Sequence, residues 1–91
     1  MNQTELIKQY ISIPTDDCQF NNVKVEKGMF YHYWTPMIEQ YNDKYIVNIT
    51  KYSDVTRFLQ KKIKTIIGDE NIIEVKGVPE NYKGRLKDFL K

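Results

Sequence analysis

The sequence predicts an α+β domain: a small, mostly antiparallel sheet of about four to five strands, with two to three helices. Several short segments alternate apolar and polar side chains with the period of two that is typical of strands. Another segment, about residues 53–67, repeats apolar side chains at helical spacing, so this main amphipathic helix should pack on one face of the sheet. The chain of 91 residues has the length of one domain, and we assign residues 1–91 to it.

A short helix is expected near the N-terminus, because Thr4 can cap a helical pattern that continues to Ile11. Pro14 should stop this helix, since proline lacks the N–H that a helix interior needs. The next alternating segment, residues 22–26, predicts a strand. Lys27-Gly28 then predicts a turn.

The most aromatic segment, residues 29–35, predicts a central strand, because aromatic side chains favour a pleated backbone. Alternation would place Tyr31 and Tyr33 on one face, with His32 and Trp34 on the other. Both faces are bulky. The strand should therefore be covered on both sides.

The segment after this strand should pair less regularly. Pro36 cannot donate a hydrogen bond to a neighbouring strand, so the pairing should weaken or bend there. Residues 37–41 are expected to continue as an edge segment, and Asn42-Asp43 as a turn. Alternation predicts a further strand at residues 45–49.

The main helix has both of its boundaries marked in the sequence. Ser53 can cap its first turn, and Gly68 suits the left-handed position after its last turn. The stripe expected to face the core consists of Val55, Phe58, Leu59, Ile63, Ile66 and Ile67. A strand should follow at residues 71–76, and Asn81 should cap a last short helix.

The residues that usually carry chemistry argue against catalysis. His32 and Cys18 are the only histidine and cysteine, so one chain can form neither an internal disulfide nor a Cys/His zinc site. The sequence has no glycine-rich phosphate loop, and acidic pairs such as Asp16-Asp17 are adjacent and tend to diverge. We therefore expect no catalytic residue, metal ligand or cofactor. An enzyme would have to depend on His32 alone.

Composition indicates the source and location of the chain. It contains no alanine and is rich in Lys, Ile, Asn and Tyr, whose codons are AT-rich, which points to a low-GC bacterium or its phages and plasmids. No apolar run is long enough to cross a bilayer, and no secretory signal is apparent. We expect no membrane association and a cytoplasmic location in the bacterial host cell.

Basic residues gather in the second half of the chain. Residues 1–50 hold four lysines against six acidic residues, whereas residues 51–91 hold ten lysines or arginines against six. The residues expected to contact nucleic acid or an acidic partner are Lys51, Arg57, Lys61, Lys62 and Lys64. A helix surface that is merely solvated would carry the same lysines, and that interpretation stays open.

Tyrosine is the second binding signal, since seven tyrosines exceed what a small core needs. The aromatic residues expected to contact a partner are Tyr31, Tyr33, Trp34 and Tyr52. The acidic residues that could mimic phosphate in a basic channel of that partner are Asp16, Asp17, Glu39 and Asp43. Alternatively, the tyrosines only cover a small sheet and keep their hydroxyls at its rim.

One pattern extends across about residues 29–63. It begins with Tyr31-His32-Tyr33-Trp34-Thr35-Pro36, continues through Asn48-Ile49-Thr50, and ends with Lys51-Tyr52-Ser53-Asp54-Val55-Thr56 at the start of a helix. This pattern resembles a group of small uncharacterised proteins from phages and plasmids of low-GC bacteria. The resemblance implies that the chain comes from a mobile genetic element. It implies no activity, because the group has none assigned.

These observations lead to two hypotheses about function. The first is an anti-defence inhibitor, similar in type to anti-CRISPR proteins, that binds a host protein or ribonucleoprotein complex that handles nucleic acid. The second is an accessory protein that binds DNA or RNA directly through the basic side of residues 53–67. A homodimer is a further alternative, because an uncovered aromatic sheet face would be an association site.

Overall fold

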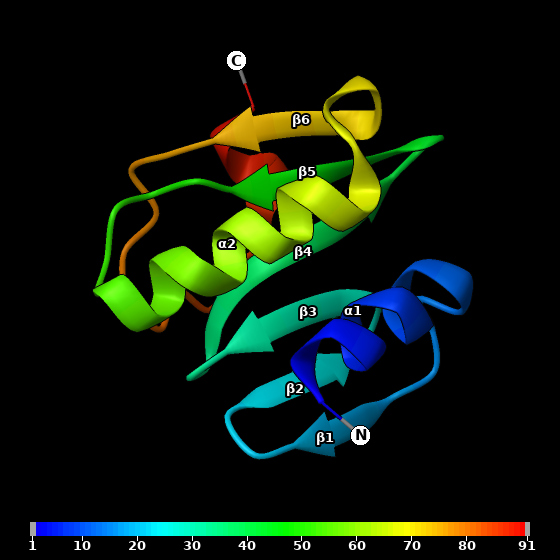
Figure 1. The fold of residues 1–91 in the computed structure, drawn as a ribbon. Helices are drawn as coiled ribbons and strands as arrows, with labels where there is room; N and C mark the ends of the chain where they lie inside the picture. The colour runs from blue at the N-terminus through cyan, green and yellow to red at the C-terminus, as the bar shows by residue number, and fades with distance from the viewer. Residues whose placement is uncertain (1, 91) are drawn as a thin grey trace.

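The computed structural model describes residues 2–90, which form two α-helices and one six-stranded sheet (Figure 1). The helices are α1 (Gln3–Ser12) and α2 (Asp54–Ile67), with the short 3-10 helices η1 (Asp69–Asn71) and η2 (Leu86–Phe89). The strands are β1 (Cys18–Phe20), β2 (Val23–Glu26), β3 (Met29–His32), β4 (Thr35–Tyr41), β5 (Lys44–Asn48) and β6 (Ile72–Val75). The predicted α+β class is confirmed.

The strands lie in the sheet in their order along the chain, from β1 to β6. Strands β1 to β5 pair antiparallel, whereas β6 pairs parallel to β5. A parallel pair needs a crossover connection, which α2 supplies between β5 and β6. The sheet is thus mixed and larger than expected. The added strand, β1, has only three residues, which is too short for its alternation to indicate a strand in the sequence.

The predicted strand at residues 29–35 is wrong, because a hairpin turn interrupts it. β3 ends at His32, which pairs with Thr35 at the start of β4. Tyr33 and Trp34 between them both have positive φ, as in the tight two-residue turns that join antiparallel strands. Aromatic residues rarely occupy such positions, so their strand propensity concealed the turn.

The irregularity expected at Pro36 is present in β4. The register between β3 and β4 shifts between Phe30 and Tyr31, and Tyr31 lies opposite Pro36. The Asn48 side chain donates to the Pro36 carbonyl over 2.9 Å and so binds β5 to this part of β4. The extra residue in β4 changes the direction of the strand just after the turn.

The two faces of the sheet have different covers. Helices α1 and α2 lie together on one face, and η2 with the C-terminal segment lies on the other (Figure 1). The core under the helices includes Leu6, Ile7, Tyr10, Val23, Val25, Phe30, Met37, Ile38, Val47, Leu59 and Ile63. The smaller core on the opposite face consists of Met29, Ile46, Val75, Val78 and Leu86.

Helix α2 begins at the expected cap, and Leu59, Ile63, Ile66 and Ile67 of the predicted stripe pack against the core. The Ser53 hydroxyl accepts from the Thr56 N–H, which confirms the cap. However, Val55 and Phe58 are 60% and 66% exposed instead of buried. Thr56 and Gln60 are buried in their place, and the Gln60 amide donates to the Asn48 and Thr50 carbonyls, each over 2.9 Å. These hydrogen bonds to the end of β5 set the rotation of the helix.

Both short terminal helices differ from their predicted form. Asn2, rather than Thr4, caps α1 by accepting from the Glu5 N–H over 2.9 Å. The helix expected from Asn81 is only the 3-10 turn η2. In residues 2–90 no helix is long and apolar enough to cross a membrane.

Candidate functional site

The turn formed by Tyr33 and Trp34, here called the aromatic turn, joins β3 to β4 and is exposed. Their φ angles are 50° and 67°, in the left-handed region that side chains other than those of Gly, Asn and Asp rarely adopt. Their side chains are 53% and 57% exposed. The Tyr33 N–H donates to the Asn22 carbonyl over 2.8 Å, and the Asn22 amide donates to the Tyr33 hydroxyl over 2.8 Å. The turn is therefore held in place rather than loose.

Two cavities flank the aromatic turn and share Trp34 and Asn81. The end cavity, of about 480 Å³, lies between the turn and the start of α2. It is lined by His32, Tyr33, Trp34, Thr35, Met37, Tyr52, Ser53, Thr56, Glu80 and Asn81. The sheet groove, of about 500 Å³, is lined by Lys24, Tyr31, Trp34, Asn81, Tyr82 and Lys83. Trp34 thus stands between two hollows of different chemistry.

The segment of residues 78–82, which contributes lining residues to both cavities, is fixed by hydrogen bonds to distant parts of the chain. The Val78 N–H donates to the Thr50 hydroxyl over 3.0 Å, and the Tyr52 hydroxyl donates to the Val78 carbonyl. The Asn81 N–H donates to the Thr35 hydroxyl, also over 3.0 Å. Because strands and side chains of the core hold this segment, the cavity walls are preformed.

His32 forms part of the floor of the end cavity. It is 2% exposed, its Nδ1 lies 3.3 Å from the Thr56 hydroxyl, and its Nε2 has no partner among the described residues. Burial lowers the pKa of His32 below its usual value, because the charged imidazolium would be poorly solvated there. The ring is accordingly neutral at physiological pH. No carboxylate hydrogen-bonds to it within residues 2–90.

The sheet groove combines aromatic rings with lysines. The Lys24 ammonium lies 4.1 Å from the centre of the Trp34 ring and 5.1 Å from that of Tyr31. Both distances are within the range of a cation–π interaction. The same ammonium is 3.4 Å from a carboxylate oxygen of Glu26, so its charge is partly balanced. Lys83 supplies a second ammonium to the groove.

Of the aromatic residues that the sequence predicted to contact a partner, all four line these cavities, but only two are strongly exposed. Tyr33 and Trp34 form the turn itself. Tyr31 is half-buried in the sheet groove. Tyr52 is also half-buried, and its hydroxyl is already bonded to the Val78 carbonyl and the Asn48 amide.

The acidic residues are not gathered near the aromatic turn. Asp17 accepts from the Lys27 N–H at the β2–β3 turn, and Asp16 accepts from Gln9. Both therefore lie at the end of the sheet opposite the aromatic turn. Asp43 lies in the β4–β5 turn, also at that opposite end.

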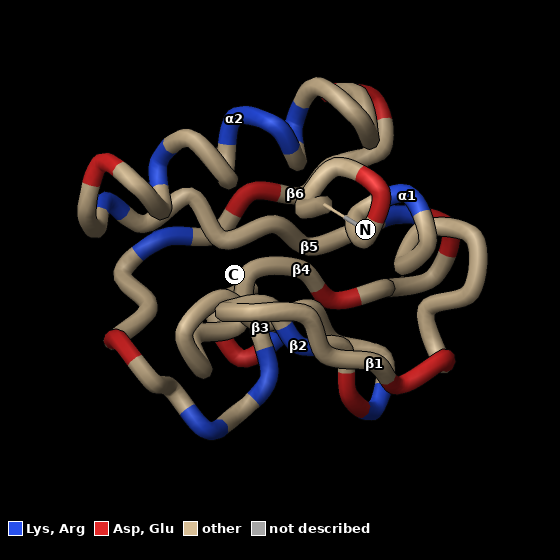
Figure 2. Tube along the Cα trace, turned by 60° about the horizontal axis from the view of Figure 1, so that its bottom comes forward, with Lys and Arg blue, Asp and Glu red and all other residues tan. Residues whose placement is uncertain are grey.

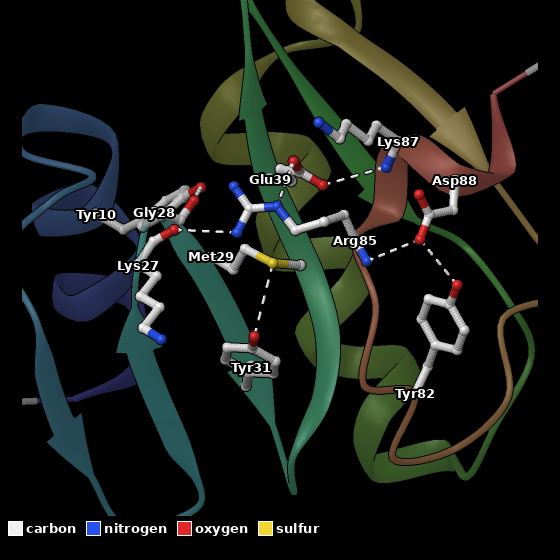
Figure 3. A network of polar contacts seen from close by, with 10 residues as sticks. All are labelled: Tyr10, Lys27, Gly28, Met29, Tyr31, Glu39, Tyr82, Arg85, Lys87 and Asp88. Carbon is white, nitrogen blue, oxygen red and sulfur yellow. Dashed lines mark hydrogen bonds and ion pairs between the residues drawn. The ribbon is translucent and has the colours of Figure 1, made fainter.

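Glu39 does not occupy the exposed position expected of a phosphate mimic. Its side chain is 4% exposed, and its Oε2 lies 3.2 Å from Nε of Arg85 (Figure 3). The Lys87 N–H donates to its other carboxylate oxygen over 3.2 Å. The Glu39 carboxylate therefore has internal partners, and its contacts hold the C-terminal segment against β4.

The basic residues of α2 differ in whether they already have partners within residues 2–90. Lys64 lies 2.8 Å from Glu74, and hydrogen bonding to this carboxylate raises the pKa of Lys64. Lys62 donates to the side chain of Gln3 in α1. Lys51, Arg57 and Lys61 are exposed and make no ion pair among the described residues. Along α2 the basic positions follow one another, with acidic positions at the start of the helix and just after its end (Figure 2).

The predicted contact residues do not include several polar residues that line these cavities, among them Lys24, Glu80, Asn81 and Lys83. Asn81 contacts Thr35 across 46 positions of the chain, a separation that no local pattern indicates. The only local indication of this loop in the sequence is the turn-forming composition of Pro79 to Asn81. In the structure Asn81 adopts a left-handed φ of 57°.

Comparison with family models, curated proteins and solved structures finds no match to this chain. Within residues 2–90 no group of three or more His, Cys, Asp or Glu side chains is placed to hold a metal ion.

Proposed function

We propose that this chain is a non-enzymatic binding protein that attaches to a partner protein through the aromatic turn. The partner we propose is a host protein or ribonucleoprotein complex that handles nucleic acid, and binding would inhibit it in the manner of an anti-defence protein. The observation that carries the proposal is the placement of Tyr33 and Trp34, both more than half exposed, at the two left-handed positions of a hairpin turn.

The aromatic turn is unfavourable for the isolated chain in two respects. Each bulky residue in a left-handed conformation costs about 1–2 kcal/mol relative to glycine. Each also leaves much of its apolar surface in water, which forfeits the burial that normally stabilises an aromatic side chain. Strain and exposure at one rigid point are typical of residues kept for contact with a partner. Aromatic side chains also dominate the binding energy of many protein interfaces.

The type of partner follows from the resemblance to phage and plasmid proteins. A short protein from a mobile element acts in the cytoplasm of the bacterial host. There, host complexes that handle nucleic acid are the main threat to the element. The chain has few groups suited to catalysis, since its only histidine is buried, neutral and without a carboxylate partner among the described residues. Occupying a surface of the target is therefore the inhibition mechanism that suits this fold.

The test is a pull-down of tagged protein from a lysate of a low-GC bacterial host, with and without nuclease, followed by mass spectrometry. The variant combines Tyr33→Asn with Trp34→Gly, which keeps the turn geometry and removes both rings. Lys27→Asn is the matched control, because Lys27 occupies the equivalent position of the β2–β3 turn, with φ of 52°. We expect a stoichiometric protein that survives nuclease and is lost only from the aromatic-turn variant. Equal recovery with that variant would refute the proposal.

Direct nucleic-acid binding is the second candidate. It is favoured by the exposure of Lys51, Arg57 and Lys61 on the α2 side without ion pairs among the described residues. Binding of a single-stranded oligonucleotide should then weaken steeply with salt, and Arg57→Glu with Lys61→Glu should abolish it. Loss of every captured partner on nuclease treatment would favour this candidate over the first.

Self-association provides an alternative use for the exposed apolar surface of α2. Val55 and Phe58 are separated by three positions and so lie on the same side of the helix, both exposed. Sedimentation at increasing protein concentration distinguishes a homodimer built on this surface from a monomer. Phe58→Lys should shift a dimer toward monomer.

A further inference from the structure

We infer that the end cavity binds the guanidinium group of an arginine side chain from the partner protein. This inference rests on the proposed function and specifies what the partner must bring to the aromatic turn. Its basis is the chemistry of the lining, the charge balance around the cavity and the rigidity of its walls.

The lining is suited to a cation. Three aromatic residues, Tyr33, Trp34 and Tyr52, line a space of about 480 Å³, and one acidic residue, Glu80, lines it with them. No lysine or arginine lines the cavity. Aromatic rings attract cations through the negative potential of their faces, and a carboxylate adds a charge-assisted hydrogen bond.

Among the residues that line the end cavity, Glu80 is the only one with a charged side chain, whereas Lys24 and Lys83 line the adjoining sheet groove. Glu80 is exposed and makes no ion pair or side-chain hydrogen bond with any residue between 2 and 90. The buried His32 ring is neutral and does not repel a cation. The start of α2 carries a partial positive charge, but Asp54 in its first turn offsets that charge.

The chain already uses Trp34 to hold a positive group of its own. The Lys24 ammonium lies 4.1 Å from the centre of the Trp34 ring, on the side of the sheet groove. The indole of this turn is thus positioned and accessible for a cation–π contact. The end cavity offers the same ring together with a carboxylate that has no internal partner among the described residues.

The walls of the cavity need little rearrangement before binding. The Asn81 N–H is bonded to the Thr35 hydroxyl, which fixes the loop that carries Glu80 against β4. The Tyr52 hydroxyl is bonded to the Val78 carbonyl at the start of the same loop. A preformed site loses less conformational entropy on binding, so even one side chain can contribute measurably.

Arginine fits this lining better than lysine. Its planar guanidinium stacks on aromatic faces, is weakly hydrated and binds a carboxylate through two parallel hydrogen bonds. Proteins that bind nucleic acid commonly expose arginines that contact phosphates. An inhibitor that captures such an arginine would compete directly with the nucleic acid.

The test uses Nα-acetyl-arginine amide as the probe and NMR as the readout. Trp34 is the only tryptophan, so its indole N–H gives one assigned signal at the cavity. We expect this signal to shift in a saturable manner with the arginine probe. Nα-acetyl-citrulline amide, a neutral probe of nearly the same shape, should produce no saturable shift, and the lysine analogue should bind more weakly than arginine.

Glu80→Gln removes the charge of the cavity and retains the shape of the side chain. We expect this variant to bind the arginine probe about tenfold more weakly, the loss typical of one hydrogen bond to a charged group. Glu70→Gln is the matched control, because Glu70 is exposed in η1 and does not line the cavity. It removes the same charge from the chain and should leave the affinity unchanged.

Several results would overturn the inference. Equal affinity for the citrulline probe would show that charge is not recognised, and equal losses from Glu80→Gln and Glu70→Gln would indicate a nonspecific charge effect. A saturable shift produced only by oligo-dT would identify a nucleic-acid site instead. The pull-down separates the two proposals: if Glu80→Gln retains the partner while the aromatic-turn variant loses it, the proposed function stands and the arginine site does not.

Discussion

Nε of Arg85 lies 3.2 Å from a carboxylate oxygen of Glu39, and this ion pair connects the middle of β4 to the segment just before η2 (Figure 3). The two partners differ in exposure, since the Glu39 side chain is 4% exposed and that of Arg85 is 45% exposed. Arg85 also donates to the Lys27 carbonyl over 3.3 Å. One arginine therefore joins β4, the β2–β3 turn and the C-terminal segment.

Arg85→Leu should reduce the free energy of unfolding by about 2 kcal/mol, because it leaves the Glu39 carboxylate buried without its cation. The loss is smaller than for a fully buried pair, since water still reaches Arg85. Adding Glu39→Leu to this variant should restore part of the loss by removing the unpaired charge. Urea unfolding of the two single variants and the double variant measures the coupling. Strict additivity would contradict the prediction.

The aromatic turn should be a site where stability and binding conflict. Tyr33→Asn with Trp34→Gly should raise the free energy of unfolding by about 1 kcal/mol, because Asn-Gly adopts the left-handed turn with little strain. Loss of the Lys24–Trp34 contact limits this gain. Thermal unfolding followed by circular dichroism provides the measurement. A clear decrease in melting temperature would mean that the two rings stabilise the fold.

Neighbouring apolar residues of α2 should differ sharply in their effect on stability. Phe58→Ala should change the free energy of unfolding by less than about 0.5 kcal/mol, since Phe58 is 66% exposed. Leu59→Ala should cost about 3 kcal/mol, because Leu59 is buried against the sheet. Chemical denaturation of both variants tests the rotation of the helix. A large loss of stability for Phe58→Ala would indicate that Phe58 is buried, as the apolar stripe predicted, and would contradict the orientation of α2 described here.

Asn48 should be among the most sensitive polar positions. Its amide donates to the Pro36 carbonyl, and its oxygen accepts from the Thr50 N–H, each over 2.9 Å, in a buried site. Asn48→Leu leaves both groups without these partners and should cost about 2–3 kcal/mol. Asn71→Leu is the control, since Asn71 is exposed and the only hydrogen bond of its side chain within residues 2–90 is a long one, over 3.5 Å, to the Ile67 carbonyl. Similar denaturation midpoints for the two variants would contradict the prediction.

His32 should make the stability depend on pH. Its pKa is lowered by burial from the ordinary value of 6.5, so the unfolded chain binds a proton more readily than the folded one. The stabilisation is complete above pH 6.5 and is lost progressively as the pH falls below that value. His32→Phe retains a ring and should flatten this part of the pH profile. An unchanged slope between about pH 6.5 and 5 would assign the dependence to other groups.

Local sequence patterns predicted those elements whose position depends on residues that are close together in the chain. Alternation located β2, because Val23 and Val25 face the core while Lys24 and Glu26 do not. The Ser53 cap located the start of α2. In each of these cases the residues that form the sequence pattern also make the stabilising contacts, so a few neighbouring positions are enough to predict the element.

The candidate site was less predictable, because it depends on contacts between distant residues. Aromatic propensity indicated a strand through Tyr33 and Trp34, and nothing local signalled the left-handed backbone. The first turns of α2 depart from the apolar stripe, because the Gln60 amide binds carbonyls at the end of β5 while Val55 and Phe58 are exposed. Glu80 lines the cavity on a loop that distant residues hold, through hydrogen bonds of Val78 and Asn81.

The strand order described above also bears on how the chain folds. Strands β1 to β5 each pair with their immediate neighbour across two-residue turns, so these pairings close only short loops and should form rapidly. Pairing of β6 with β5 should follow the formation of α2, which connects the two strands. The loop that carries Glu80 should be placed only after β6 has paired. The aromatic turn therefore arises early and the cavity beside it late. A nascent chain that still lacks the segment after β6 would already expose the rings of Tyr33 and Trp34. It could not yet bind a ligand between these rings and Glu80.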